Sequence, residues 1–554
     1  MTTPIRLVEA AAAWATGFRL ADAPPDVLEL SKAQVANIIA AIVAGAASKA
    51  GLAVRTATSR AAAPGPCAVI PDGQRLALAD ALYLHAAYAN ALELDDFHFR
   101  GHLGPAAVVV PLSLGAFLGS SGADLLRAQI VANELGGRLG WSITAEVRHG
   151  HQRSYLLRFA AAAAAAVLLG LDQRRCATAL AIAMTQPEMT LHPGMFSPDT
   201  KVLSAASSVV EGVRAAFLAE AGLSAALDII EHPAGFYRQF TMHRSVANPF
   251  VQFGEAWCTS ALSFKRYSAC AYAAGSVDAA LEIRRDSSFD PALVRSIEVA
   301  SSLPALVMER LARPHEPGQL TPVNVQFSIL RSVAAALTVG DLRGHQFQPA
   351  PFTAMEPGIR RLEAVSRLVH DWPFTIHQLR GIDDGMPEGG GGHSADMLQF
   401  YRTSSAFRRM FGSVRAIGLA DIRRLLSLSS DDRRFFTQRW RRSLNNHLSR
   451  TSRPGARQVG DLRRLSWRMG GRVTVRLDGG RVLSAERIIP TGMAGDPNRI
   501  AVVREKLLEE TRGRLGLPGA KALWAAIDRL ASAPTIELAT LASVTTETPH
   551  AAAH

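Results

Sequence analysis

The chain has 554 residues, of which 48% are hydrophobic and only 6% aromatic, and it carries a formal net charge of +12. This length predicts two domains, and the abundance of small apolar side chains favours closely packed helices over a β-sandwich. The four cysteines lie far apart in the sequence. This spacing excludes the Cys-x-x-Cys patterns of zinc and iron–sulfur sites, and it indicates a reducing compartment.

Export signals and membrane spans are also absent from the sequence pattern. The N-terminus has no basic segment followed by a long apolar core, as a secretory signal would have. The most purely apolar run, residues 159–171, is shorter than the roughly 20 residues that span a bilayer. We therefore expect a soluble, cytoplasmic protein with no membrane partner.

The positive charge is concentrated in one segment. Residues 401–470 contain seventeen Arg and four Asp, which accounts for the whole net charge. A nucleic-acid partner is therefore not expected for the protein as a whole. Residues 374–460 form a predicted insertion, with the tether-like sequence GMPEGGGGHS and Arg-rich helical stretches. Either this insertion is a solvated helical region, or its Arg and aromatic residues bind an anionic partner.

Helical periodicity dominates the first 250 residues, and no strand pattern of any length is found there. An amphipathic helix is expected to end at Gly51, and the helix that Asp172 opens should stop before Pro187. The Ala-rich segment 158–171 is expected to be a buried central helix whose neighbours approach closely. In chain order, the predicted segments are helix 26–51, loop 52–75, and helices 75–92, 111–119, 121–146, 158–171, 172–186 and 201–222.

Beyond Lys265 the pattern becomes mixed. The alternation around Ile297 and Val299 predicts a strand, and residues 472–489 predict a β-hairpin that turns at Asp478-Gly479. Helices are expected at 331–339, 500–510 and 519–532. The second half is therefore predicted to be an α+β region that is followed by further helices.

One stretch, ANALELDDFHFRGHLGPAAVVVP at residues 89–111, holds many titratable groups between an apolar helix and an apolar run. Groups held at the edge of a core have shifted pKa values, which makes them candidates for acid–base chemistry. These residues are Glu93, Asp95, Asp96, His98, Arg100 and His102.

This stretch and five others, in the same order, resemble the MmgE/PrpD family, which includes 2-methylcitrate dehydratase, cis-aconitate decarboxylase and iminodisuccinate epimerase. The likeness covers about residues 30–370 and 470–540. The other matching pieces include RHGHQRSYLLRFAAAAAAAVLLGLD, SPDTKVLSAASSVVEGVRAAF, SFKRYSACAYAAGSVDAAL, QFSILRSVAAALTVG and the closing RVTVRLDGGRVLSAERIIPTGMAGDPN.

The resemblance implies a mostly α fold. A large all-helical domain is expected at 1–265, a smaller α+β lid domain at 266–490 with the insertion at about 374–460, and C-terminal helices at 491–554 that return to the helical domain. It also implies a homodimer, and an active site between the two domains that needs no metal or organic cofactor. The implied chemistry is proton transfer next to a carboxylate or carbonyl of a small-molecule substrate, coupled to dehydration, decarboxylation or isomerisation.

The resemblance also assigns roles to single residues. The residues assigned to catalysis are His102 as the acid/base group, Asp95 in the acidic segment, His151 before the Ala-rich helix, Lys201 for a substrate carboxylate, and Lys265 for developing negative charge. Glu93 and Tyr267, which lie in the same segments, are expected to contact the substrate. Without the resemblance, an isolated His or a helix-start lysine is more often structural, and Asp95 could serve only to position the loop that follows it.

Several positions depart from the family pattern. Phe97 stands in place of Thr, Ala274 in place of His, and Arg331 in place of Tyr. A site for a tricarboxylate is not expected to survive the loss of these polar groups, because each leaves part of the substrate unpaired. Phe97 and Ala274 predict a more apolar and larger pocket. Arg331 either clamps a carboxylate bidentately or faces solvent.

Two hypotheses follow. The first is a lyase or isomerase that keeps the family's proton-transfer chemistry, including enolate-type cyclisation, and acts on a bulkier, less acidic substrate of specialised biosynthesis. Such an enzyme is not expected to dehydrate 2-methylcitrate. The second is an inactive relative that serves as a binding or scaffold subunit through its Arg-rich insertion.

Overall fold

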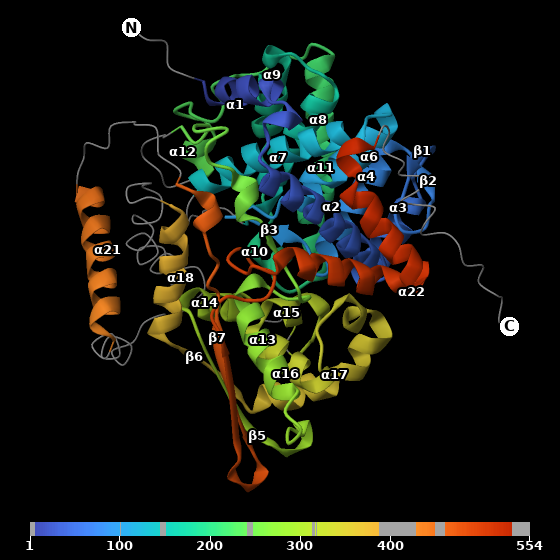
Figure 1. The fold of residues 1–554 in the computed structure, drawn as a ribbon. Coiled ribbons are helices and arrows are strands. Elements are labelled where there is room, and N and C mark those ends of the chain that lie inside the picture. Colours follow the sequence, from blue (N-terminus) through green and yellow to red (C-terminus); the bar gives the residue numbers. More distant parts are fainter. Residues whose placement is uncertain are drawn as a thin grey trace, which may run out of the picture.

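The computed structural model describes residues 6–99, 101–143, 151–240, 248–312, 316, 318–386, 428–448 and 460–533. Most of these residues lie in helices, and the strands form one four-stranded sheet and two small two-stranded pairs. Figure 1 shows a large helical body and, below it, a smaller part that contains the four-stranded sheet. The predicted mostly α fold with a small α+β part is confirmed.

The helical body is built around the Ala-rich helix α8, which packs against α7, α9 and α11. Every residue of α8 from Arg153 to Val167 is buried, because alanine side chains let neighbouring helices approach closely. The helices of this body are α1 (Leu7–Gly17), α2 (Pro25–Ala46), α3 (Lys49–Ser59), α4 (Leu78–Ala91), α5 (Gly104–Ala107), α6 (Val109–Leu118), α7 (Gly122–Ser142), α8 (Arg153–Leu168), α9 (Gln173–Thr185), α10 (His192–Met195), α11 (Leu203–Glu220) and α12 (Phe236–Phe240).

Local sequence signals set several of these helix ends. The side chain of Asp172 accepts a hydrogen bond from the backbone N–H of Arg175 at 2.8 Å, which caps the start of α9. Ser121 and Asp124 form a capping box at the start of α7. The helix α9 ends at Thr185, so the predicted stop before Pro187 is confirmed.

Two predictions for the first hundred residues were wrong. The helix α2 ends at Ala46 rather than at Gly51, and a new helix, α3, then extends to Ser59, into the first part of the segment that was predicted to be a loop. Ser48 starts α3 by accepting a hydrogen bond from Gly51 N at 3.0 Å, so this glycine lies in a first helical turn. The helical periodicity across 26–51 conceals this break because both helices bury apolar residues.

The prediction that the first half has no strands was also wrong. The strands there are β1 (Pro64–Ala68), β2 (Arg75–Leu76) and β3 (Asp96–Phe97), and β3 pairs with β4 (Ser263–Phe264). Two-residue strands are too short to produce a detectable alternation of apolar and polar residues. The β3–β4 pair nevertheless determines the geometry of the candidate site.

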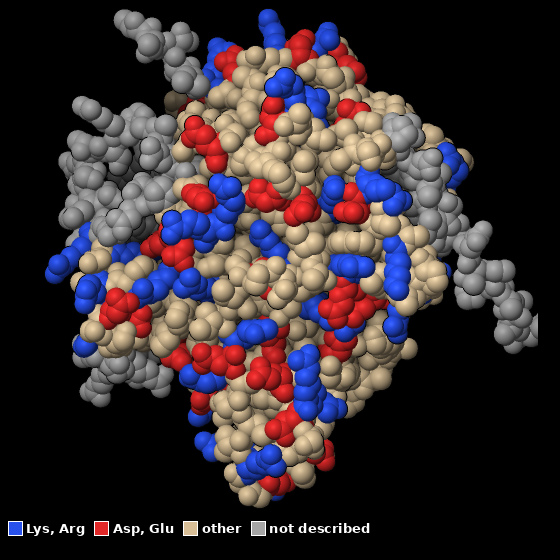
Figure 2. Space-filling model, in the orientation of Figure 1, with Lys and Arg blue, Asp and Glu red and all other residues tan. Residues whose placement is uncertain are grey.

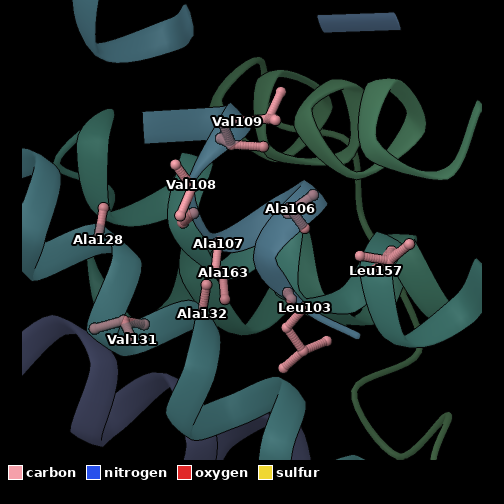
Figure 3. Packing of buried hydrophobic residues seen from close by; sticks show 14 of the residues in the cluster. Leu103, Ala106, Ala107, Val108, Val109, Ala128, Val131, Ala132, Leu157 and Ala163 are labelled. Atoms are coloured by element: carbon pink, nitrogen blue, oxygen red, sulfur yellow. The ribbon is translucent and has the colours of Figure 1, made fainter. Parts of the chain in front are cut away.

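Apolar packing anchors the chain that follows His102. Figure 3 shows Leu103, Ala106, Ala107, Val108 and Val109 packed against residues of α7 and α8, among them Ala128, Val131, Ala132, Leu157 and Ala163. All of these residues are fully buried. Because the residue after His102 is fixed in this core, the imidazole is attached to a rigid part of the fold.

The smaller part is an α+β unit. Its sheet has the strand order β6–β5–β7–β8, in which β5 is parallel to β6 and antiparallel to β7. The predicted strand at Ile297 and the predicted hairpin through Asp478-Gly479 are both confirmed. The elements are α13 (Ala271–Arg284), β5 (Val294–Ser301), α14 (Leu303–Leu311), α15 (Pro322–Phe327), α16 (Ile329–Val339), α17 (Pro349–Ala364), β6 (Ser366–His370), β7 (Gly471–Leu477) and β8 (Val482–Arg487).

The insertion begins with α18 (Trp372–Gly385) and includes α21 (Ser430–Leu448), which lie side by side in Figure 1. Its predicted helical character is confirmed there, whereas most of the GMPEGGGGHS tether lies outside the described residues. Arg380 on α18 pairs with Asp431 and Asp432 on α21, at 2.7 and 2.9 Å. Part of the insertion's charge is therefore neutralised within the chain.

The last long helix, α22 (Arg499–Asp528), returns to the helical body and packs on α2. It consists of two helical segments that meet at a kink at Gly516, where φ is +64°, which agrees with the two helices predicted at 500–510 and 519–532. Within the described ranges, two segments, α2 and Asp199–Glu220, are long and apolar enough to cross a membrane by length and composition. In both, most of the apolar window is buried inside the protein, 83% and 61% respectively, as expected for core helices.

The surface carries charges of both signs. In Figure 2, Lys and Arg are interspersed with Asp and Glu over the described part of the visible face. Many of these side chains form short-range pairs, such as Arg360 with Glu356 on α17 and Arg472 with Glu486 across the β7–β8 hairpin. A strongly basic sequence thus folds without a single-sign surface on this face.

Candidate functional site

A buried cluster of charged side chains lies where the helical body meets the α+β unit. Its members are Glu93, Asp95, His102, Arg153, Lys201 and Lys265. All of them except His102 are at most 1% exposed. Charged groups are rarely buried unless they are paired, so their arrangement determines both the stability and the chemistry of this region.

The β3–β4 ladder explains how Lys265 reaches the acidic residues. Asp96 faces Phe264 and Phe97 faces Ser263 in an antiparallel register. Asp95 and Lys265 are the next residues outward on the two strands, and Lys265 Nζ lies 2.7 Å from Asp95 Oδ1. The register therefore brings together two residues that are far apart in the sequence.

Glu93 accepts bonds from two lysines at once. Its Oε2 lies 2.6 Å from Lys265 Nζ, and its Oε1 lies 2.8 Å from Lys201 Nζ. Burial opposes ionisation of Glu93, but Lys201, Lys265 and Arg153 hold its pKa well below the usual range. The backbone of Glu93 has φ +54°, in the left-handed region. Such a conformation costs about 1–3 kcal/mol and is found mainly where the surrounding structure enforces it.

His102 and Asp95 form a hydrogen-bonded pair. His102 Nδ1 lies 3.2 Å from Asp95 Oδ2, and the pKa of Asp95 is well below its usual range, since Lys265, His102 and Arg153 outweigh its burial. Burial, Arg153 and Lys265 lower the pKa of His102 to about 4. At neutral pH the imidazole is therefore neutral, Nδ1–H donates to Asp95, and Nε2 has a free lone pair.

His102 is also the accessible member of the cluster. Its side chain is 20% exposed, while that of Asp95 is fully buried. Solvent therefore reaches the imidazole, whereas the carboxylates and lysines of the cluster are buried. This is the position that a general base requires.

The buried cluster has an excess of positive charge. Arg153, Lys201 and Lys265 supply three cationic groups, and Glu93 and Asp95 supply two anionic ones. Burial lowers the pKa of Lys201 to about 8, although Glu93 opposes this, while Asp95 and Glu93 raise the pKa of Lys265 against the effect of its burial. Both lysines are predominantly charged at neutral pH. Such an excess favours the binding of an anion, for example a carboxylate.

His151 lies beside this cluster, at the start of α8. Its Nδ1 accepts a hydrogen bond from Arg153 N at 3.3 Å, and its ring contacts Phe196 edge to face. Burial and Arg153 lower its pKa well below the usual value, so it is neutral. Its geometry places a second uncharged imidazole near the cationic groups.

An apolar wall adjoins His102. The ring of Phe97 lies 5.7 Å from the imidazole and 5.9 Å from the ring of Trp467, which follows the insertion. Ala274 belongs to the same buried cluster, as does Trp141. The indole N–H groups of Trp141 and Trp467 are buried, and neither has a hydrogen-bond partner in the part of the chain that the structure describes. A buried, unpaired donor costs about 1–3 kcal/mol, which a ligand oxygen would offset.

Four predicted residues, Tyr267, Arg331, Arg100 and His98, do not join the ion-pair cluster or cannot be placed. Tyr267 donates its hydroxyl to Asp278 Oδ1 at 2.7 Å, and Arg331 bonds Glu363 and the carbonyl oxygen of Ala312. Arg100 lies outside the described residues. His98 is buried in the altered loop, where its Nε2 contacts the carbonyl oxygen of Asn133.

Sequence reasoning missed Asn90 and Arg153. The side-chain NH2 of Asn90 donates to the carbonyl oxygen of Lys201 at 3.0 Å, and the guanidinium of Arg153 bonds Asn90 and lies 3.4 Å from Glu93 Oε1. Both lie inside the matched stretches, but a single Asn or Arg at a helix end gives no signal of burial. Among the described residues, no group of three or more His, Cys, Asp or Glu is placed to hold a metal ion.

Comparisons with known proteins show what the chain is similar to. Residues 9–248 match the family model of the MmgE/PrpD N-terminal domain. The chain is 30% identical to cis-aconitate decarboxylase of Aspergillus terreus over 289 residues, which cover 49% of this chain and 59% of that protein. It is 26% identical over 360 residues to the cis-aconitate decarboxylase-like protein oryM of Aspergillus oryzae, covering 61% and 74% respectively. Cis-aconitate decarboxylase of Homo sapiens is 27% identical over 224 residues, covering 39% and 46%. The chain thus spans less than two thirds of the length of the Aspergillus terreus relative.

Proposed function

We propose that this chain, a divergent member of the MmgE/PrpD family, is a lyase or isomerase that moves a proton at the carbon next to a carboxylate. The relatives named as cis-aconitate decarboxylases support a lyase-type reaction. The observation that carries the proposal is the His102–Asp95 pair beside an excess of buried positive charge.

Each part of the site has a role in this reaction. Neutral His102, held by Asp95, accepts the proton through Nε2. Removing this proton, or losing carbon dioxide from the same carbon, leaves negative charge on an enolate-like carboxylate. Lys265, Lys201 and Arg153, which supply the buried excess of positive charge, would stabilise that charge.

The apolar wall indicates which kind of substrate would fit the site. Phe97 borders the imidazole and Trp467 packs against Phe97, and neither side chain offers a charge to a second or third carboxylate. We propose a substrate that carries an apolar group beside its reacting carboxylate, in place of the additional carboxylate of a tricarboxylic acid. Homodimer formation and cytoplasmic location are part of the same proposal.

Solvent deuterium exchange tests this function without knowledge of the product. The purified protein is incubated in D2O with a panel of unsaturated and 2-alkyl-substituted mono-, di- and tricarboxylic acids, and deuterium incorporation and carbon dioxide release are measured. We expect reaction with alkyl-bearing acids, and its loss in His102→Gln but not in His345→Gln, an exposed histidine. Equal activity of the His102→Gln variant, or no reaction with any member of the panel, would refute the proposal.

A further inference from the structure

Lys506 is a buried lysine on α22, and it is not among the residues to which the sequence analysis assigned a catalytic or substrate-binding role. Its side chain is 1% exposed. Its Nζ donates hydrogen bonds to the carbonyl oxygens of Leu94, at 2.9 Å, and of Lys265, at 2.7 Å. A residue from the last long helix thus holds backbone atoms on both sides of the candidate site.

The position of these two carbonyl groups is informative. The β3–β4 ladder ends at the pair Asp96 and Phe264, and the chain outward of it carries Asp95 and Lys265. Beyond that pair the described residues of the two strands share no backbone hydrogen bond of the ladder. There, Lys506 links them by donating to the carbonyl oxygens of Leu94 and Lys265. It therefore acts on the segment in which Lys265 Nζ and Asp95 Oδ1 must lie 2.7 Å apart.

A simple packing role does not require a lysine there. Burying an ammonium group is costly, and a methionine would fill a similar volume without that cost. Burial lowers the pKa of Lys506 to about 7, although Glu510, Asp95 and Asp96 oppose this effect. The feature that a methionine lacks is the set of N–H donors that reach two carbonyl groups.

We propose that Lys506 is a positioning residue that fixes the spacing between Asp95 and Lys265, and so couples α22 to the acid–base group. Asp95 in turn orients His102 through Nδ1. The expected effect on turnover rests on the proposed function, whereas the expected effect on the β3–β4 backbone does not.

The experiment uses the full chain with Lys506→Met, which removes the donors, and Lys506→Gln, which keeps an uncharged donor. Lys521→Met, at an exposed position of the same helix, is the matched control. Hydrogen exchange is measured by mass spectrometry on peptides that cover residues 92–98 and 262–267. We expect exchange there to be at least about tenfold faster in Lys506→Met, with unchanged exchange in α8. The control should behave as the wild type.

Turnover separates positioning from a purely structural role. With an acid that the protein converts, kcat should fall roughly tenfold to a hundredfold in Lys506→Met while KM changes less than about threefold. The kcat of Lys506→Gln should lie between those of the wild type and Lys506→Met. If the Met variant does not fold, the test is made with the Gln variant. Unchanged exchange in a folded variant, or faster exchange with unchanged kcat, would overturn the inference.

A different readout serves if the wild type converts no acid, in which case the proposed function has failed by itself. The pKa of His102 is then followed by NMR in histidine-labelled protein. We expect it to rise from its depressed value in Lys506→Met, since a loosened Asp95–Lys265 pair admits water to the imidazole. An unchanged pKa would overturn the inference.

Discussion

Lys265 Nζ lies 2.7 Å from Asp95 Oδ1, and the two residues face each other across the continuation of the β3–β4 ladder. Backbone register, rather than the flexible lysine side chain alone, sets this distance. The charges that a reaction would use are therefore in place before any substrate arrives, which is the arrangement that gives the largest electrostatic stabilisation of a transition state.

Removing one partner of the buried cluster should strongly destabilise the fold. Glu93→Gln leaves Lys201 and Lys265 without their shared carboxylate, so the free energy of unfolding should fall by about 3–5 kcal/mol. Urea unfolding at neutral pH measures this change. The control is Glu211→Gln, which breaks a surface pair with Arg214 and should cost less than about 1 kcal/mol. Equal losses in the two variants would contradict the prediction.

The pH dependence of kcat/KM should be bell-shaped. His102 must be neutral to accept a proton, so activity falls as the pH drops through its pKa of about 4. Lys201 must be charged to bind a carboxylate, so activity also falls as the pH rises through its pKa of about 8. A pH–rate profile with any converted acid measures both limbs. In Lys201→Arg the alkaline limb should move to higher pH, because a guanidinium remains charged; an unmoved limb would assign it to another group.

Trp467 should matter more for binding than for stability. Its indole N–H has no hydrogen-bond partner among the residues that the structure describes, so Trp467→Phe should change the free energy of unfolding by less than about 1 kcal/mol. Trp467→Ala, which empties the apolar wall, should cost about 3–5 kcal/mol. Calorimetric titration with a substrate acid should show weaker binding to the Phe variant. A large stability loss in Trp467→Phe would mean that the N–H is already bonded within the fold.

The close contact at Gly104 should be intolerant of a side chain. A Cβ atom at this position would overlap Asp96 Oδ1 and the side chain of Ile38. Gly104→Ala should therefore destabilise the protein by about 1–3 kcal/mol, measured as a lower thermal unfolding midpoint. Gly17→Ala, where nothing lies within 4 Å of the added atom, should be neutral. If both variants unfold at the wild-type temperature, the packing of α5 against β3 and α2 is looser than described.

The long periodic elements could be predicted from the sequence. The Ala-rich segment gave α8, Asp172 and Pro187 bracketed α9, and the alternation around Asp478-Gly479 gave the β7–β8 hairpin. In each case a local signal coincides with the final structure. The α2–α3 break was missed because both helices have the same periodicity and Ser48 alone marks the boundary.

The candidate site could be predicted only in part. The charged stretch pointed to Glu93, Asp95 and His102, but nothing local indicated that Lys506 belongs beside them. The available signal was its place between Val503 and Leu507 on the apolar stripe of a helix, where a charged residue is unexpected. Two-residue strands such as β3 and β4 leave no pattern at all, so only the tertiary fold shows that they pair.

The apolar cluster beside His102 includes Met386 from the first part of the insertion and Leu462, Leu465 and Trp467, which follow the insertion. The ion-pair cluster, by contrast, is supplied by residues 93–265. The apolar cluster therefore combines residues of that same stretch, such as Phe97, with residues of the insertion and of the segment that follows it. A change in the length or sequence of the insertion could alter which acid is accepted while the proton-transfer machinery stays intact, which would make this segment the natural place for new specificities to evolve.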